Sequence, residues 1–177
     1  MQRWPPRGAG AIALLVILAL ILLLDGGSDE GGSGEGAMAG PAAGERTTVD
    51  VLRVVDGDTI EVDLDGTTED VRYIGVDTPE TVKPGTPVEC FGEQASDFNH
   101  ELVEDQVVRL EFDRELRDDY GRLLAYVYVG EEFVNAELVA GGYARTLEIE
   151  PNTSRAEQLG RLETEAGAAG RGLWGAC

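Results

Sequence analysis

The sequence predicts an α+β domain in which a five-stranded OB-fold β-barrel carries three α-helices. Five short segments rich in β-branched and aromatic residues are separated by turns that contain Asp and Gly. One helical pattern follows the third of these segments, and two more follow the fifth. Five strands with a helix inserted after the third form the order of elements expected for a small closed barrel of the OB type.

A hydrophobic segment and a flexible acidic linker precede this domain. Arg3 and Arg7 stand before the uncharged run Gly8–Leu24, and acidic residues follow it, a charge order that places the rest of the chain outside the cytoplasm. The run is longer than the ~7–15-residue core of a signal peptide and at the short limit for a spanning helix. Residues 1–24 are therefore predicted to be a signal peptide or a membrane anchor, with the anchor slightly favoured, and the protein is expected to be exported.

The next segment, residues 25–46, consists mainly of Gly, Ser, Ala and acidic residues, which cannot build a core. We expect it to be a flexible linker, with residues 47–177 forming one folded domain that acts as a monomer, extracellular or at the outer face of the membrane. Its acids are spread along the whole domain, which excludes an acidic tail.

The charge of the chain is extreme for its length. Its 177 residues carry a formal net charge of −20, and Lys83 is the only lysine. Such a surface repels itself in dilute buffer, whereas at molar salt the Debye length falls to about 3 Å and the repulsion largely disappears. The composition therefore indicates adaptation to a salt-rich medium.

The first three strands are expected to form a meander. A strand from about Val49 to Val55 is followed by a turn that contains Asp58 and by the alternating strand Ile60–Leu64. The third strand carries Arg72 and ends at Thr78-Pro79, because proline cannot donate to a β-ladder. The turn with Asp58 can then lie beside the end of the third strand.

The end of the third strand gathers one cation and two carboxylates. Arg72 and Asp77 are five residues apart, so in a regular strand their side chains would lie on opposite faces. We expect the chain to bend at Gly75, which would bring both side chains to one site and leave Glu80 in the following loop. By itself, this stretch also fits a strand with an exposed salt bridge and an acidic turn.

The rest of the chain supplies the remaining strands and helices. The helix after the third strand begins near Gly92, and His100, the only histidine, falls on its polar face, which argues against histidine-based catalysis. The other predicted elements are the strands Val107–Phe112 and Leu123–Val129 and the helices Asn135–Ala140 and Thr153–Ala166.

Three motifs in this order resemble the staphylococcal (thermonuclease) nuclease family. They are Asp56-Gly57-Asp58-Thr59, Arg72 followed by Asp77-Thr78-Pro79-Glu80, and Asp119-Tyr120-Gly121-Arg122 with Leu123–Tyr126. The likeness continues through Asn135 and Pro151-Asn152 and covers about Val49 to Trp174.

The resemblance implies a Ca²⁺-dependent phosphodiesterase that hydrolyses DNA and/or RNA with little sequence preference and leaves 3′-phosphates. It implies a role for each of seven residues. Asp58, Asp77 and the carbonyl of Thr78 would bind Ca²⁺, Glu80 would act on the attacking water, and Arg72, Arg122 and Tyr120 would contact the phosphate. These roles suit the chemistry, because Ca²⁺ prefers oxygen ligands and guanidinium groups bind phosphate in a fork.

Two departures from the family concern substrate binding. Glu148-Ile149-Glu150 stands where the family's best-known member has a pair of tyrosines that stack on the nucleotide, and Asp119 replaces a lysine beside the site. The first change leaves open how the bases stack there. The lack of lysines predicts weak substrate binding, since phosphate affinity at ordinary salt depends on Lys and Arg.

Two other classes of function remain open: a non-catalytic nucleic-acid-binding OB-fold module and a Ca²⁺-binding structural domain of the cell envelope. Degenerate binding copies of the family typically lose the Arg or Glu of the site. An adhesion site, for its part, has no use for paired arginines. The presence of Arg72, Glu80 and Arg122 therefore favours the enzyme.

Cys90 and Cys177 are the only cysteines. In an exported chain two cysteines indicate a disulfide, with two free thiols as the alternative. In the family the tryptophan that corresponds to Trp174 packs near the start of the first helix. The resemblance therefore implies that Cys177 lies within reach of Cys90.

Overall fold

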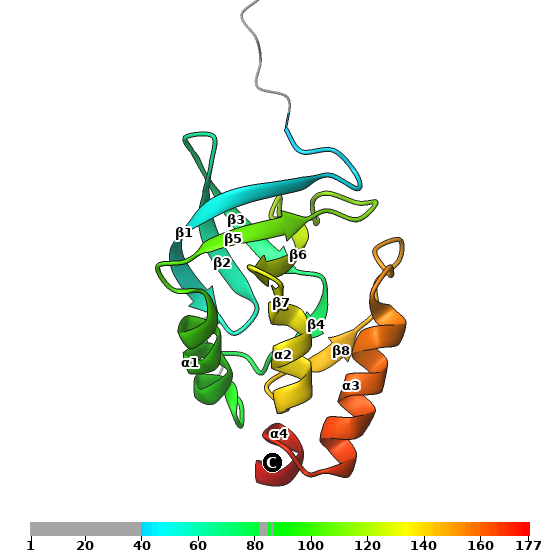
Figure 1. The fold of residues 1–177 in the computed structure, drawn as a ribbon. Helices are drawn as coiled ribbons and strands as arrows, with labels where there is room; N and C mark the ends of the chain where they lie inside the picture. The colour runs from blue at the N-terminus through cyan, green and yellow to red at the C-terminus, as the bar shows by residue number, and fades with distance from the viewer. Residues whose placement is uncertain (1–39, 82–84, 86) are drawn as a thin grey trace, which may run out of the picture. The chain divides into compact units, whose positions relative to one another are not determined.

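The computed structural model describes residues 40–81, 85 and 87–177, and a five-stranded barrel forms its centre (Figure 1). Its strands are β1 (Arg46–Asp56), β2 (Thr59–Leu64), β3 (Thr67–Tyr73), β5 (Val107–Glu111) and β6 (Leu123–Val129). Antiparallel neighbours follow the order β3-β2-β1-β5-β6, and a parallel pairing of β3 with β6 closes the barrel. The predicted OB-fold barrel is confirmed.

The core fills the barrel with the inward side chains of all five strands. Val49 and Val51 of β1 and Ile60 and Val62 of β2 are buried two residues apart, as the alternating sequence pattern predicts, and an irregularity in register between Val51 and Arg53 interrupts the alternation in β1. The side chains that the strands contribute are mostly β-branched or aromatic: Val49, Val51, Val54, Ile60, Val62, Val71, Tyr73, Val108, Leu110, Leu123, Ala125 and Val127.

The structure adds residues to the predicted start of the domain. β1 begins at Arg46, and two residues assigned by prediction to the linker are bonded to the barrel. Gly44 donates its N–H to the carbonyl of Phe112, and the Phe112 N–H donates to the carbonyl of Glu45. These bonds prolong the β1–β5 ladder, so the last residues before β1 are fixed to the sheet.

The third predicted strand is divided at Gly75, where the bend was expected. Gly75 has φ +80, a left-handed conformation that favours glycine. β4 (Gly75–Asp77) therefore leaves the barrel and pairs with β8 (Arg145–Leu147) as a separate two-stranded sheet. The bend puts the Asp77 end of β4 beside the turn between β1 and β2.

Three helices of two turns or more lie at one end of the barrel in Figure 1: α1 (Gly92–Val103), α2 (Val134–Gly141) and α3 (Ala156–Ala168). The prediction placed the start of α3 too early, at Thr153. The N–H of Ser154 donates to Asp113, and that of Arg155 donates to the hydroxyl of Tyr126. These bonds hold the turn that precedes the helix, and the helix itself begins at Ala156.

The sequence pattern did not reveal three short elements. They are β7 (Glu132–Phe133), which pairs with β6, the strand β8, and α4 (Leu173–Ala176) near the C-terminus. Elements this short carry too few residues for a periodic pattern.

Within the residues that the structure describes, no helix is long and apolar enough to cross a membrane. The predicted signal peptide or anchor, and the linker up to residue 39, lie outside the described residues.

Candidate active site

The turn between β1 and β2 presents Asp58, which is 5% exposed. Its N–H donates to the Asp56 carboxylate over 3.0 Å. The buried Asn99 of α1 fixes the turn from below: its amide donates to the Asp56 carbonyl, and its oxygen accepts from the hydroxyl of Tyr73. A helix and a barrel strand thus hold Asp58 in place.

Burial, reinforced by the negative charge of Asp58, raises the pKa of the Asp56 carboxyl to about 6. Two carboxylates therefore share a small, poorly solvated turn, where a nearby positive charge would stabilise their ionised forms.

Arg72 supplies this positive charge from the end of strand β3, just before the bend. Its Nε lies 3.2 Å from an Asp58 oxygen, and its Nη2 lies 3.1 Å from Asp77. Its Nη1 donates to the carbonyls of Tyr73 and Val76, over 2.9 and 2.8 Å. Because the guanidinium spans both sides of the bend, Arg72 ties Asp58 to Asp77.

Thr78 completes this group. One oxygen of Asp58 accepts hydrogen bonds from both the N–H and the hydroxyl of Thr78, each over 2.8 Å. Gly57 makes the close approach possible, since a Cβ there would lie 2.7 Å from the Thr78 hydroxyl oxygen. Asp58, Arg72, Asp77 and Thr78, which the sequence analysis assigned to one site, are in direct contact.

Glu80 lies in the loop just beyond this group. Burial raises the pKa of the Asp77 carboxyl, Arg72 lowers it, and the negative charges of Asp58, Glu89 and Glu80 raise it further. Glu80 and Glu89 therefore lie close enough to Asp77 to act on it electrostatically. The N–H of Glu80 donates to the Glu89 carboxylate over 3.1 Å.

Arg122 reaches the same region because β3 and β6 run side by side, with Arg72 opposite Leu124. Asp118 holds it firmly: its carboxylate accepts from the Arg122 N–H and Nε and lies 2.7 Å from Nη2. Tyr120, 87% exposed, lies in the same loop with its ring 5.5 Å from the Arg122 guanidinium carbon.

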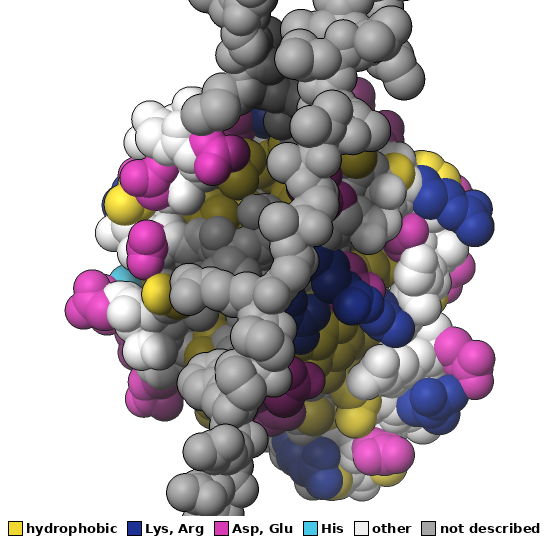
Figure 2. Space-filling model, turned by 45° about the horizontal axis from the view of Figure 1, so that its top comes forward, with side chains coloured by type: hydrophobic (Ala, Val, Ile, Leu, Met, Phe, Trp, Pro, Cys, Tyr) yellow, Lys and Arg dark blue, Asp and Glu magenta, His cyan; other side chains and the backbone are white. Residues whose placement is uncertain are grey.

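Arg72, Tyr120 and Arg122 line one cleft of about 390 Å³. Acidic and apolar side chains form the rest of its wall, among them Asp119, Leu147 and Ile149. Ile149 is 59% exposed, an unusual place for isoleucine on a surface this acidic. The face shown in Figure 2 has basic side chains gathered beside a hydrophobic band, with acidic side chains around them.

The sequence analysis missed two residues that support this site, Asn99 and Asp118. Asn99 stands on the buried face of a helix, where a single Asn is an unusual residue. Asp118 stands four residues before Arg122 in a turn, a position from which an Asp commonly bonds to the backbone. His100 is paired with Glu104 on α1 and takes no part in these contacts.

The donor set fits a hard divalent cation. The fit rests on two carboxylates, Asp58 in the turn between β1 and β2 and Asp77 at the end of β4. Burial, reinforced by the charges of neighbouring acids, raises the pKa of the Asp77 carboxyl. No group of three or more Asp, Glu, His or Cys side chains in metal-binding arrangement occurs among the described residues. Asp58, Asp77 and the Thr78 carbonyl would therefore need water or substrate oxygens to complete a coordination shell.

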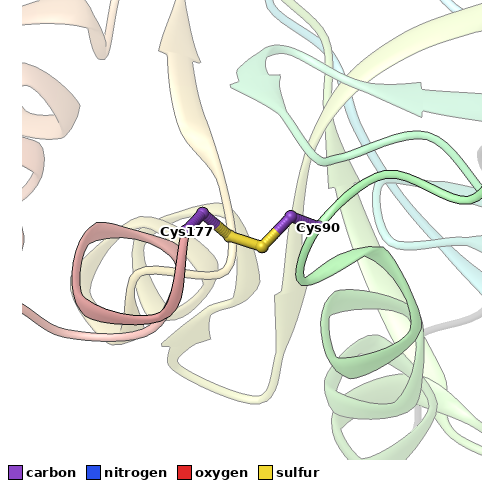
Figure 3. The surroundings of a disulfide bond; sticks show 2 residues. All are labelled: Cys90 and Cys177. Carbon is purple, nitrogen blue, oxygen red and sulfur yellow. A yellow bond between two sulfur atoms is a disulfide. The ribbon is translucent and has the colours of Figure 1, made fainter.

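A disulfide joins Cys90, just before α1, to Cys177, just after α4 (Figure 3). Their Cα atoms are 6.0 Å apart across a sequence separation of 87 residues. The pairing expected from the sequence is the one that the structure contains, and it fastens the C-terminus to the segment that follows Glu80.

An OB-fold barrel whose rim carries carboxylates and arginines has the chemistry of enzymes that act on phosphate esters. Residues 70–176 match the family model described as staphylococcal nuclease homologue. The chain is 42% identical to a thermonuclease of Staphylococcus hyicus over 161 residues, 91% of this chain and 94% of that protein.

Two further relatives agree. A thermonuclease of Staphylococcus intermedius is 48% identical over 70% of this chain and 74% of its own length. The endonuclease YncB of Bacillus subtilis is 47% identical over 69% of this chain and 59% of its own length. The chain belongs to the staphylococcal nuclease family, and it is a nuclease.

Proposed function

We propose that the protein is a Ca²⁺-dependent phosphodiesterase that hydrolyses DNA and/or RNA with little sequence specificity and leaves 3′-phosphates. The observation that carries the proposal is the position of Arg72, which bridges Asp58 and Asp77 and lines the same cleft as Arg122. Such a cleft offers guanidinium groups for a phosphate and carboxylates for a cation at one place.

The two arginines would hold the scissile phosphate. Arg72 uses four of its five N–H donors on protein partners, which leaves an Nη2–H for a phosphate oxygen. Arg122 contacts Asp118 through its Nε and Nη2. Among the contacts of the described residues, none involves its Nη1, which could bind the substrate. Because these guanidinium groups are already fixed in place, they do not have to reorganise when they stabilise the charge that builds up on the phosphate oxygens.

Glu80 would take the proton of the attacking water. Histidine is the most common general base, but the single histidine of this chain, His100, pairs with Glu104 on α1 and takes no part in the site contacts. A carboxylate therefore suits the role. Attack breaks the bond between phosphorus and the 5′-oxygen, which takes up a proton from solvent, departs as a hydroxyl and leaves the 3′-phosphate. Tyr120 would donate a hydrogen bond from its exposed hydroxyl to the phosphate. Ca²⁺, held by Asp58, Asp77 and the Thr78 carbonyl, would supply positive charge to the same phosphate.

Plasmid degradation with Ca²⁺ or with a chelator tests the proposal, together with thermal unfolding as a readout that does not depend on activity. Ca²⁺ should raise the melting temperature of the wild type through binding to the folded state. Asp77→Asn should reduce that increase, while the matched control Asp119→Asn, on the cleft wall, should keep it. Full activity in chelator, or an undiminished Ca²⁺ effect in Asp77→Asn, would contradict the proposal.

We also propose that the protein works outside the cytoplasm, as an anchored or secreted monomer. The charge order around the hydrophobic run Gly8–Leu24 supports export, and so does the disulfide, which persists in an oxidising compartment.

Salt should strongly affect the folded domain. Because the chain carries a net charge of −20 and its acids are spread along the domain, we expect the domain to lose structure and activity in dilute buffer and to recover both at molar NaCl, where screening removes the repulsion. Thermal melts across a NaCl series measure this. A variant with exposed acids neutralised, Asp70→Asn with Glu131→Gln and Glu132→Gln, should need less salt. Melting temperatures that do not change with NaCl would show that the composition has another cause.

A further inference from the structure

Glu89 contacts both peptide groups that flank the Cα atom of Glu80. Its carboxylate oxygen Oε2 accepts a hydrogen bond from the Glu80 N–H over 3.1 Å. Its own N–H donates to the Glu80 carbonyl over 2.9 Å. One residue therefore holds the backbone of Glu80 on both sides, across a separation of nine residues.

These two contacts determine where the Glu80 side chain starts. The Cα–Cβ bond direction is fixed once the peptide planes before and after the Cα atom are fixed. Glu80 follows Pro79 in a loop, outside any ladder or helix that would fix those planes. Glu89 thus fixes the backbone at Glu80, as the strands β3 and β4 fix the backbone at Arg72 and Asp77.

Glu89 is itself attached to rigid parts of the molecule. Its carbonyl accepts from the N–H of Gly92, the first residue of α1, over 3.0 Å. Gly92 allows close packing there, because a Cβ would lie 3.1 Å from the Pro79 carbonyl oxygen and 3.2 Å from that of Glu80. The next residue, Cys90, is bonded to Cys177 (Figure 3).

We propose that Glu89 is a positioning residue for the reaction: it aims the carboxylate of Glu80 at the attacking water through the hydrogen bonds to its backbone. The proposal rests on the role of Glu80 proposed above. Glu89 adds a third carboxylate beside those of Asp77 and Glu80, and because like charges repel, stability alone does not explain an acid at this position. The side-chain hydrogen bond to the Glu80 N–H explains why an acceptor stands here.

Replacing Glu89 tests the proposal through separate measurements of kcat and KM. Glu89→Ala removes the side-chain acceptor and should lower kcat roughly tenfold with little change in KM, since misplacing a reacting group costs rate. Glu89→Gln keeps an acceptor oxygen without the charge and should restore most of the rate. Wild-type kcat in Glu89→Ala, or equal losses in both variants, would overturn the proposal.

Two controls separate positioning from stability. Glu93→Ala removes an exposed acid from the first turn of α1 and should leave kcat unchanged. Cys177→Ser should lower the melting temperature yet keep kcat at low temperature, because the Glu89 carbonyl stays bonded to the N–H of Gly92 in α1. A loss of kcat in Cys177→Ser as large as that in Glu89→Ala would mean that instability alone explains the effect.

A double-mutant cycle and amide exchange separate this proposal from the role of Glu80 itself. If Glu89 acts through Glu80, Glu89→Ala should have no further effect on kcat in the Glu80→Gln background. The amide proton of Glu80 should exchange faster in Glu89→Ala, whatever Glu80 does in catalysis. Unchanged exchange would refute the positioning contact, while full activity of Glu80→Gln would refute only the proposed base.

Discussion

Glu80→Gln should lower kcat by about 10²–10⁴-fold, the usual contribution of a positioned general base. Glutamine keeps the size of the side chain and leaves the backbone bonds to Glu89 in place, so the fold should be preserved. Single-turnover rates on a defined oligonucleotide, with circular dichroism to verify folding, measure the effect. A near-native rate would remove Glu80 from the mechanism.

The same experiment applies to the two arginines. Arg72→Lys and Arg122→Lys should each lower activity by about 10²–10³-fold, because an ammonium group cannot reproduce the fork of a guanidinium. For Arg72, one lysine nitrogen cannot reach Asp58, Asp77 and two carbonyls at once. Arg53→Lys, in an exposed pair with Glu61, is the matched control and should be silent. Wild-type activity in either site variant would exclude that arginine.

Cys90→Ser should produce the largest change in stability. Opening a loop of this length lowers the free energy of unfolding by about 4–5 kcal/mol in the chain-entropy model. The C-terminus retains other contacts, since the Leu173 N–H donates to Gly142 and Arg145 lies over the Trp174 ring. We therefore expect a lower melting temperature and nearly unchanged activity at low temperature.

Thiol titration gives an independent check of the disulfide. The unfolded, unreduced wild type should show no free thiol, and the reduced protein should show two. Two reactive thiols before reduction would contradict the disulfide, and so would equal melting temperatures of the wild type and Cys90→Ser.

Most of the barrel was predictable because local sequence patterns indicate its strands and turns. Alternation in Ile60–Leu64 indicates a half-buried strand, and a Gly between Arg72 and Asp77 indicates a bend; both features are present. The order of elements predicted a closed barrel, but no local pattern shows which strands pair over long stretches of sequence, as β3 does with β6 and β4 with β8. The turn before α3 is held by tertiary partners of Ser154 and Arg155, which a local pattern does not record.

The candidate site shows the same division. The motifs shared with the family and the expected bend at Gly75 pointed to Asp58, Arg72 and Asp77, which the structure brings into contact. Their roles in catalysis stay predictions that the variants above test. The supporting residues Asn99, Asp118 and Glu89 each act through specific hydrogen bonds to particular backbone or side-chain groups, and a pattern of residue types carries no record of such bonds.

The parallel pairing of β3 with β6 also has a consequence for the time at which activity appears. Arg72 and Arg122 come together only when the chain between these strands has been traversed and the last ladder of the barrel has formed. Non-local pairings of this kind form slowly, because chain entropy is lost before contacts compensate for it. During refolding, nuclease activity should therefore return no earlier than barrel closure, and partly folded chains should be harmless to nucleic acid.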